Sequence, residues 1–203
     1  MDVLVPFAAT EPKTRLAGVL SADERAELAR KMLFDVCSGL DSIGRSPTVL
    51  STDPIDCEWP VVVDGAPLTD AVNARLEPPV AVVMADLGLA TPAALSRLFD
   101  PDADVVLAPG LGGGTNALVV RTPSFRVDYH GASIADHRRT ASAAGADPAI
   151  VDSFRLAVDI DEADDLAELL LYGSGESAAW LRSAGLEVAT NGGRVTTRRT
   201  GEP

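Results

Sequence analysis

The sequence predicts an α/β fold, a three-layer sandwich around a mostly parallel, Rossmann-like mixed sheet. Two valine-rich runs, residues 80–85 and 105–108, are short and end abruptly, which is typical of strands buried on both faces. Strand-like runs alternate with helical patterns along the chain, which favours a sheet covered by helices on both sides. The length of 203 residues suits one core, so we expect a single domain over residues 1–203 with a polar, frayed tail at about 196–203.

The expected elements follow from apolar periodicity and from the residues that begin and end each run. Ser21 and Glu24 form a capping box at the start of a helix that we expect Gly39 to end. The other helices are expected at residues 68–76, 92–99 after a Thr91 cap, 132–144, 162–171 after an Asp161 cap, and 176–184. The strands are expected at residues 3–7, 48–51, 61–63, 80–85, 105–108, 116–121, 154–158 and, at an edge, 186–189.

An acid and a glycine-rich loop follow the two central strands. Asp86 comes directly after residues 80–85, and the run from Gly110 to Thr115 follows residues 105–108. Because ligands of open α/β sheets bind beyond the carboxyl ends of strands, we expect both features to face one crevice, the active site. No helix follows the glycines, which disfavours a dinucleotide site. The loop is either a nest of backbone N–H groups for an anion or a plain glycine turn.

More charged residues are candidates for the same crevice. Asp159 and Asp161 follow the strand expected at 154–158 and point to one side if that strand continues. Together with Asp86 they would hold a hard divalent cation such as Mg²⁺. Lys13 and Arg15 lie in the loop after the first strand and, facing the same crevice, would bind a triphosphate. The plainer alternatives are helix-capping aspartates and a solvated pair of surface cations.

The composition limits the partners. The formal net charge is −13, which repels nucleic acid and anionic membranes, so neither is an expected partner. No stretch is long and apolar enough to span a membrane and no secretion signal begins the chain, so we expect a cytoplasmic protein. Lysine occurs only as Lys13 and Lys31. That balance is typical of proteins of salt-loving organisms, although an acidic protein of a GC-rich genome would also have it.

The motifs as a set carry a resemblance to a known family. In chain order they are VPFAATEPKTRL (5–16), MADLGL (84–89), APGLGGGTNAL (108–118), DSFRL (152–156) and DIDEADDL (159–166). They resemble the 2-phospho-L-lactate guanylyltransferase family, which belongs to the nucleotidyltransferase class that includes the molybdopterin guanylyltransferases. The resemblance extends to about residue 186, implies a sheet like that of nucleotide-diphospho-sugar transferases and, with the composition, points to a salt-loving archaeon.

The resemblance implies an activity. Enzymes of this family join GMP from GTP to 2-phospho-L-lactate, or to phosphoenolpyruvate in some members, and release pyrophosphate in the biosynthesis of coenzyme F-420. For this chain it implies that Mg²⁺ binds to Asp86, Asp159 and Asp161, which with Lys13 are the expected catalytic residues. GTP and a phosphorylated three-carbon acid are the expected substrates, and a homodimer is the expected assembly.

The resemblance also implies which residues bind each substrate. It places the triphosphate on Lys13 and Arg15. It places the three-carbon acid on Gly113, Gly114, Thr115, Ser133 and the backbone near His130. For guanine, the candidates are Asp53 and the segment that begins at Gly65, although Asp53 also suits a turn. We expect His137 to lie on the surface or to face a phosphate rather than to catalyse.

Two alternatives stay open. One is a nucleotidyltransferase that acts on another phosphorylated acceptor, a molybdopterin or a sugar phosphate. It is disfavoured because the first loop lacks the glycine-rich, arginine-bearing pattern common in those relatives. The other is a non-catalytic nucleotide-binding protein on the same fold, which the intact set of three acids disfavours. The sequence leaves open which three-carbon acid is used and how strictly GTP is preferred.

Overall fold

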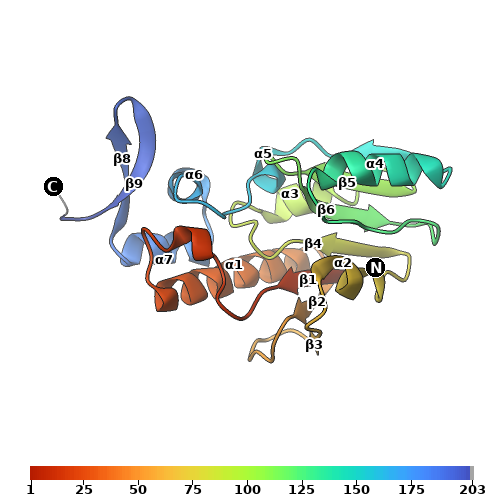
Figure 1. Ribbon diagram of the computed structural model, residues 1–203, viewed down its shortest axis with the longest axis horizontal. Helices are drawn as coiled ribbons and strands as arrows, with labels where there is room; N and C mark the ends of the chain where they lie inside the picture. Colours follow the sequence, from red (N-terminus) through yellow and green to blue (C-terminus); the bar gives the residue numbers. More distant parts are fainter. Residues whose placement is uncertain (202–203) are drawn as a thin grey trace.

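The computed structural model describes residues 1–201, and its main sheet has seven strands in the order β3-β2-β1-β4-β6-β5-β7 (Figure 1). The strands are β1 (Asp2–Phe7), β2 (Ser46–Ser51), β3 (Val61–Val63), β4 (Val80–Val83), β5 (Val105–Pro109), β6 (Thr115–Val120) and β7 (Pro148–Ile150). Neighbouring strands are parallel except that β6 runs antiparallel to both β4 and β5. The predicted mixed, mostly parallel sheet is therefore confirmed.

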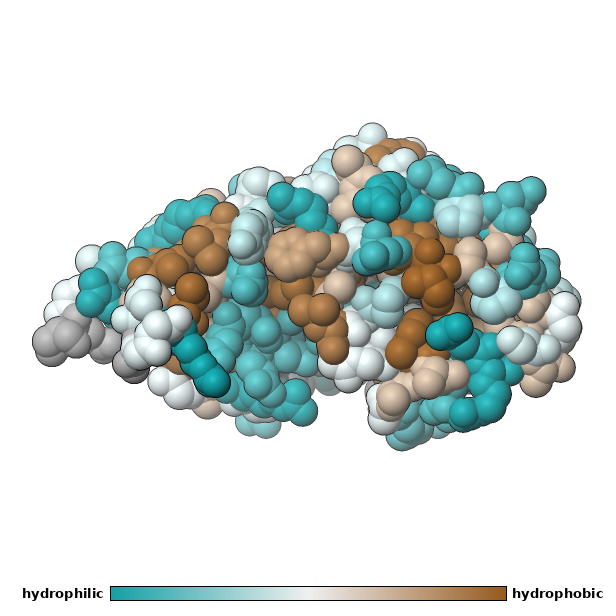
Figure 2. Space-filling model, turned by 90° about the horizontal axis from the view of Figure 1, so that it is seen from above, coloured by the Kyte–Doolittle hydropathy of each residue, from teal (hydrophilic) through white to brown (hydrophobic). Residues whose placement is uncertain are grey.

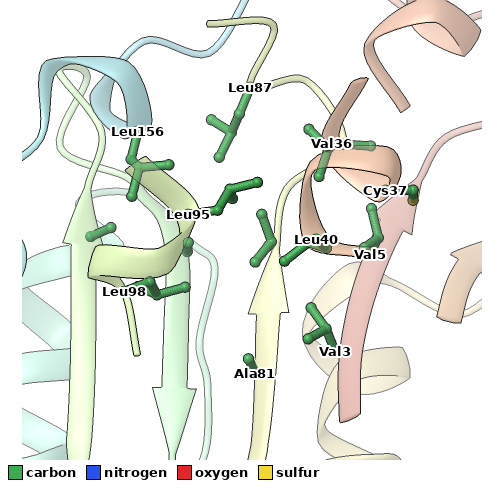
Figure 3. Close-up of a cluster of buried hydrophobic side chains, with 14 of the residues drawn as sticks. Val3, Val5, Val36, Cys37, Leu40, Ala81, Leu87, Leu95, Leu98 and Leu156 are labelled. Atoms are coloured by element: carbon green, nitrogen blue, oxygen red, sulfur yellow. The ribbon is translucent and has the colours of Figure 1, made fainter. Parts of the chain in front are cut away.

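Helices cover both faces of this sheet because successive strand residues point to opposite sides. On one face, Val3 and Val5 join a buried cluster with α1 (Ala22–Ser42), α3 (Pro92–Arg97) and α5 (Phe154–Ala157). On the other face, Leu4 joins a cluster with α2 (Leu68–Asn73) and α4 (Ser133–Ala143). Figure 3 shows the first cluster, with Leu95 of α3 and Leu40 of α1 lying over the strands. The three-layer arrangement is thus confirmed.

A third buried cluster extends the molecule beyond the end of the sheet. Here α6 (Asp165–Tyr172) and α7 (Glu176–Ser183) pack with the first half of α1 through Leu28, Met32, Leu166, Leu169 and Leu181. The strands β8 (Leu186–Asn191) and β9 (Arg194–Arg199) form a separate antiparallel hairpin beside these helices (Figure 1). This cluster packs around the segment that carries two of the candidate acids.

The structure corrects two predicted boundaries on the α1 face. Residues 154–157 form the short helix α5 instead of a strand, because the N–H groups of Leu156 and Ala157 both donate to the Ser153 carbonyl. The edge strand that pairs with β5 on the side away from β6 is β7, which was not among the strands expected from the sequence. The helix α1 passes through Gly39 and ends at Ser42. A side chain at Gly39 would place Cβ 2.8 Å from Leu95 Cδ1, so this glycine permits close packing of α1 on α3 rather than ending the helix.

Two further expectations near the C-terminus are wrong. Asp161 does not cap α6, which begins four residues later; instead the Asp165 carboxylate accepts the N–H groups of Asp161 and Glu162 at 2.9 Å and 2.7 Å. The strand from Leu186 is not an edge of the main sheet, and residues 196–199, expected to be frayed, lie in β9. Pairing with β8 orders them. Residues 202–203 of the expected tail lie outside the described residues.

Candidate active site

Three carboxylates from two distant segments meet at the carboxyl end of β4. Asp86 lies just beyond β4, and Asp159 and Asp161 lie on the extended connection between α5 and α6. The Ile160 N–H donates to the Asp86 carbonyl at 3.1 Å, which ties the two segments together. One oxygen from each of the three carboxylates lies within 4.8 Å of the others.

The two-residue spacing of Asp159 and Asp161 has the predicted consequence without the predicted strand. The backbone is extended at Val158, which precedes the pair, and Ile160 between the two acids is fully buried in the third cluster. Alternation in an extended segment then turns both aspartates away from that cluster and toward Asp86.

Lys13 inserts its ammonium group among these acids. Its Nζ lies 2.8 Å from Asp86 Oδ2 and 2.7 Å from Asp161 Oδ1, and its side chain is only 10% exposed. Burial alone would lower the pKa of Lys13, but the charges of Asp86 and Asp161 outweigh it and raise that pKa above its ordinary value. The backbone of Lys13 is left-handed, with φ of 56°, and this turn into the short 3-10 helix Thr14–Leu16 points the side chain inward.

The single ammonium group of Lys13 does not balance the charge of three carboxylates. Asp86 Oδ1 is buried and has no hydrogen-bond partner within residues 1–201. Burial is the largest cause that raises the pKa of Asp159, and the nearby negative charge of Asp86 raises it further. A buried, unpartnered carboxylate oxygen beside two more carboxylates is the hard oxygen donor set that Mg²⁺ and similar cations prefer. The residues present therefore fit a divalent cation.

Two clefts adjoin the acids and share Asp161. The first has a volume of about 250 Å³ and is lined by Phe7, Pro12, Lys13, Met84 and Asp86 in addition to Asp161. The second has a volume of about 280 Å³ and is lined by Arg15, Gly112, Asp159 and Glu162 in addition to Asp161. Arg15 is 69% exposed and lies 3.8 Å from Glu162, so it borders the second cleft and does not join Lys13 among the acids.

Asn116 holds Asp159 in place and was not among the residues expected from the sequence. Because β6 is antiparallel, its first residues lie beside the last residues of β4, where the Met84 N–H donates to the Asn116 carbonyl. The buried Asn116 amide donates to the Leu156 carbonyl at 3.0 Å and to Asp159 Oδ1 at 3.2 Å. A Cβ at Gly110 would lie 2.6 Å from Asn116 Oδ1, so that position requires glycine. The sequence signal was an asparagine directly after the glycine loop, at the start of an otherwise apolar strand.

The glycine-rich loop is itself hydrogen-bonded. The N–H groups of Gly110, Leu111 and Gly113 donate to the carbonyls of Gly114, Ala157 and Gly110. Gly113 has a φ of 83°, which favours glycine. In this conformation the loop is a glycine turn joined to the acid-bearing segment, and these three N–H groups are not free for an anion.

Thr115 and Ser133, the two hydroxyl residues expected to bind the three-carbon acid, lie together at the foot of this turn. Their hydroxyl oxygens are 3.3 Å apart, and each residue is only 3% exposed. His137 does not lie on the surface, one of the two positions expected for it: this residue is fully buried and its Nδ1 lies 2.9 Å from Thr115 Oγ1. His130 is instead exposed, and its ring pairs with the Asp128 carboxylate at 2.6 Å.

Asp53 and Gly65 lie near the loop that follows β1. Thr10 donates its hydroxyl to Asp53 Oδ2 at 2.6 Å, and the Ala9 N–H donates to Thr52 Oγ1 at 3.0 Å. A Cβ at Gly65 would lie 3.9 Å from the Thr52 carbonyl oxygen, so Gly65 borders the same corner. The structure thus brings the two guanine candidates next to the loop that carries Lys13.

Within the part of the chain that the structure describes, no helix combines the length and the apolar character needed to cross a membrane.

The chain is similar in sequence to a known protein family and to curated proteins. A family model described as "Guanylyl transferase CofC like" matches residues 1–200. A curated protein of Natronomonas pharaonis is 65% identical over 201 residues, which is 99% of this chain and all of that protein. One of Halomicrobium mukohataei is 59% identical over 202 residues, which is 98% of this chain and all of that protein. Both are named 2-phospho-L-lactate guanylyltransferase, and most such relatives are from halophilic archaea.

Solved structures share the fold at low sequence identity. A Desulfovibrio desulfuricans protein assigned to the nucleotide-diphospho-sugar transferases is 19% identical, with a TM-score of 0.71, and the match covers 90% of this chain and 95% of that one. A nucleotidyl transferase of Methanothermobacter thermautotrophicus is 12% identical, with a TM-score of 0.53, and the match covers 90% of this chain and 98% of that one.

Proposed function

The chain belongs to the CofC-like guanylyl transferase family, and from that premise we propose that it joins GMP from GTP to 2-phospho-L-lactate with release of pyrophosphate. This reaction would serve coenzyme F-420 biosynthesis, in the cytoplasm, where GTP is available. Phosphoenolpyruvate is the second acceptor that we propose to test, because it shares the phosphate and the carboxylate of a three-carbon acid.

The observation that carries this proposal is the meeting of Asp86, Asp159 and Asp161 around the Lys13 ammonium group. A nucleotidyl transfer concentrates negative charge on the triphosphate and on the departing pyrophosphate. Preorganised cationic groups at that place stabilise the transition state more than they stabilise the separated substrates. Lys13 supplies one positive charge there, and the acids fit a site for more.

We propose that the three aspartates hold Mg²⁺. When bound, the ion neutralises phosphate oxygens and orients them for in-line displacement. Asn116 keeps Asp159 in place through its 3.2 Å hydrogen bond, and Asp165 fixes the backbone of Asp161. These contacts keep the carboxylates close together although like charges repel each other.

The reaction needs no side chain that removes a proton. The acceptor's phosphate is already anionic near neutral pH and can attack the α-phosphorus of GTP directly. Neither histidine of the chain is placed as a base beside the acids: His137 is buried against Thr115, and His130 is exposed and paired with Asp128. The arrangement favours catalysis by positioning and charge neutralisation.

We propose that both substrates lie against the acids. The donor triphosphate would lie along Lys13 and Arg15, with guanine near Asp53 and Gly65. Support for this placement comes from the Thr10–Asp53 hydrogen bond, which joins the guanine corner to the loop that carries Lys13. The acceptor would lie against Gly113, Gly114, Thr115, Ser133 and the backbone at His130.

We also propose that the protein is a homodimer. Phe154 and Tyr172 pack edge to face at a centroid distance of 5.2 Å, yet each stays nearly half exposed, as does Leu171. Figure 2 shows that hydrophobic residues gather in patches between hydrophilic ones on the face it displays. Sedimentation of the full chain should give the mass of two copies, and a single-copy mass would contradict the proposal.

An acceptor assay tests the proposed activity. The protein, GTP and Mg²⁺ at high salt should release pyrophosphate when phospholactate or phosphoenolpyruvate is added, and not without an acceptor. All four nucleotides, a molybdopterin and sugar phosphates form the comparison set. Pyrophosphate release only with a molybdopterin or a sugar phosphate would favour a nucleotidyltransferase that acts on that acceptor. No release with any acceptor would contradict enzymatic function.

A further inference from the structure

His137 is a buried histidine whose two ring nitrogens both have defined partners. The Asp128 backbone N–H donates to Nε2 at 2.8 Å, and Nδ1 lies 2.9 Å from Thr115 Oγ1. Phe125 and Tyr129 pack edge to face against the ring at centroid distances of 5.7 Å and 5.3 Å. The imidazole is therefore held in one orientation.

These partners determine where the ring carries its proton. A backbone N–H is only a donor, so Nε2 must be an unprotonated acceptor. Burial lowers the pKa of His137 to about 4, against weaker opposing effects of Asp128 and Asp136, so the ring is neutral near pH 7. A neutral imidazole that lacks a proton on Nε2 carries it on Nδ1. His137 therefore donates to Thr115 Oγ1 rather than accepting from it.

This direction decides what the neighbouring hydroxyls can do. The Thr115 and Ser133 oxygens are 3.3 Å apart, so the pair needs one of its two protons for the hydrogen bond between them. Because His137 donates, it takes no proton from the pair, and the second proton stays available for an incoming acceptor atom. With the opposite tautomer, Thr115 would donate to the ring and Ser133 to Thr115, which would leave no proton for a ligand.

We propose that His137 is a positioning residue for the acceptor: it orients the Thr115–Ser133 hydroxyl pair so that one O–H group points at an anionic oxygen of the phosphorylated acid. The inference rests on the proposed function, because it takes this pair as part of the acceptor site. His137 itself does not touch the substrate in this role and moves no proton.

Two substitutions separate the two hydrogen bonds of the ring. In His137→Asn, the amide can place an N–H group where Nδ1 lies and so keep the donor to Thr115. In His137→Gln, the amide oxygen can reach the Nε2 position and keep the acceptor for Asp128, but the donor to Thr115 is lost. Both replacements are neutral amides that leave part of the ring volume empty, so a loss due only to packing would affect both.

We expect His137→Gln to raise the KM for the acceptor about ten-fold, the effect of one lost hydrogen bond, with kcat and the KM for GTP within about two-fold of wild type. His137→Asn should keep the acceptor KM within about three-fold of wild type. Equal acceptor KM values in the two variants would overturn the inference. Absence of pyrophosphate release in the wild type would instead contradict the proposed function, and the inference with it.

A spectroscopic measurement tests the tautomer without turnover. Long-range ¹H–¹⁵N correlation spectra of the full chain should show, for His137, a protonated Nδ1 and an unprotonated Nε2 at pH 7. The chain has only two histidines, so His130→Gln assigns the signals. A protonated Nε2 would overturn the inference whatever the kinetics show.

Discussion

At the scale of single residues, Lys13 places a positive charge between two of the three acids. Its ammonium group is the counter-charge of two partly buried carboxylates, Asp86 and Asp161. Removal of one partner from such a cluster leaves unbalanced negative charge in a poorly hydrated place. The residue therefore has a structural role in the metal-free protein besides the role that we propose in catalysis.

Lys13→Met should lower the free energy of unfolding by about 2 kcal/mol in the presence of a chelator, because the acids then repel each other without a counter-charge. Added Mg²⁺ should raise the melting temperature of this variant more than that of wild type. Denaturant unfolding and thermal melts measure both effects.

Lys31→Met is the matched control, since Lys31 is the only other lysine and its partners Glu27 and Glu176 are more exposed. We expect it to change stability by less than about 0.5 kcal/mol. Equal losses in the two variants, or an equal response to Mg²⁺, would contradict the role given to Lys13.

At the scale of elements, α7 begins without a capping side chain of its own. Gly175 stands at its N-cap, and Asp35 of α1 performs this function from the neighbouring helix. The Asp35 carboxylate accepts the N–H groups of Glu176 and Ser177 at 2.7 Å and 2.9 Å. A Cβ at Gly175 would lie 2.4 Å from this carboxylate, so glycine there permits the close approach of α7 to α1.

Asp35→Ala should lower the free energy of unfolding by about 2 kcal/mol, because two N–H groups and the positive end of the helix dipole lose their partner. Asp35→Asn keeps one acceptor oxygen and should lower the free energy of unfolding by about half as much as Asp35→Ala. Urea unfolding measures both, with the exposed Asp102→Ala as control within about 0.5 kcal/mol. A cost for Asp35→Ala no larger than that of the control would show that α7 does not depend on this cap.

On the scale of the whole molecule, self-repulsion is the dominant electrostatic feature. The formal net charge of −13 is spread over a chain with only 17 basic residues. Repulsion between exposed charges is long-ranged in dilute buffer and is screened when salt shortens the Debye length to about 3 Å at 1 M. The folded state should therefore be most stable in concentrated salt, which agrees with relatives from halophilic archaea.

The melting temperature should rise by at least about 5 °C between 0.05 M and 2 M KCl, a gain of about 2 kcal/mol. Most of the rise should occur below about 0.5 M, where screening changes fastest. Calorimetry across a KCl series measures it. A melting temperature that stays flat or falls would show that repulsion does not limit the stability of this fold.

Local sequence features were sufficient for six of the seven strands of the main sheet, β1 to β6. Short valine-rich runs specified β4 and β5, and the absence of a helical pattern after the glycines correctly gave β6. The errors arose where two local patterns compete. The segment DSFRL has an apolar pattern compatible with a strand, but hydrogen bonds to the Ser153 carbonyl turn it into α5. Gly39 resembled a helix stop, but it lies inside α1, where its lack of a side chain makes room for Leu95.

The sequence by itself determined the α/β class, the strands β1 to β6 and the three candidate aspartates, because each depends on residues close together in the chain. Only the tertiary structure decided that Asn116 holds Asp159, that Lys13 lies between Asp86 and Asp161, and that His137 supports Thr115 from inside the fold. These contacts join segments far apart in the chain, and no local pattern encodes the antiparallel course of β6 or the packing that brings them together.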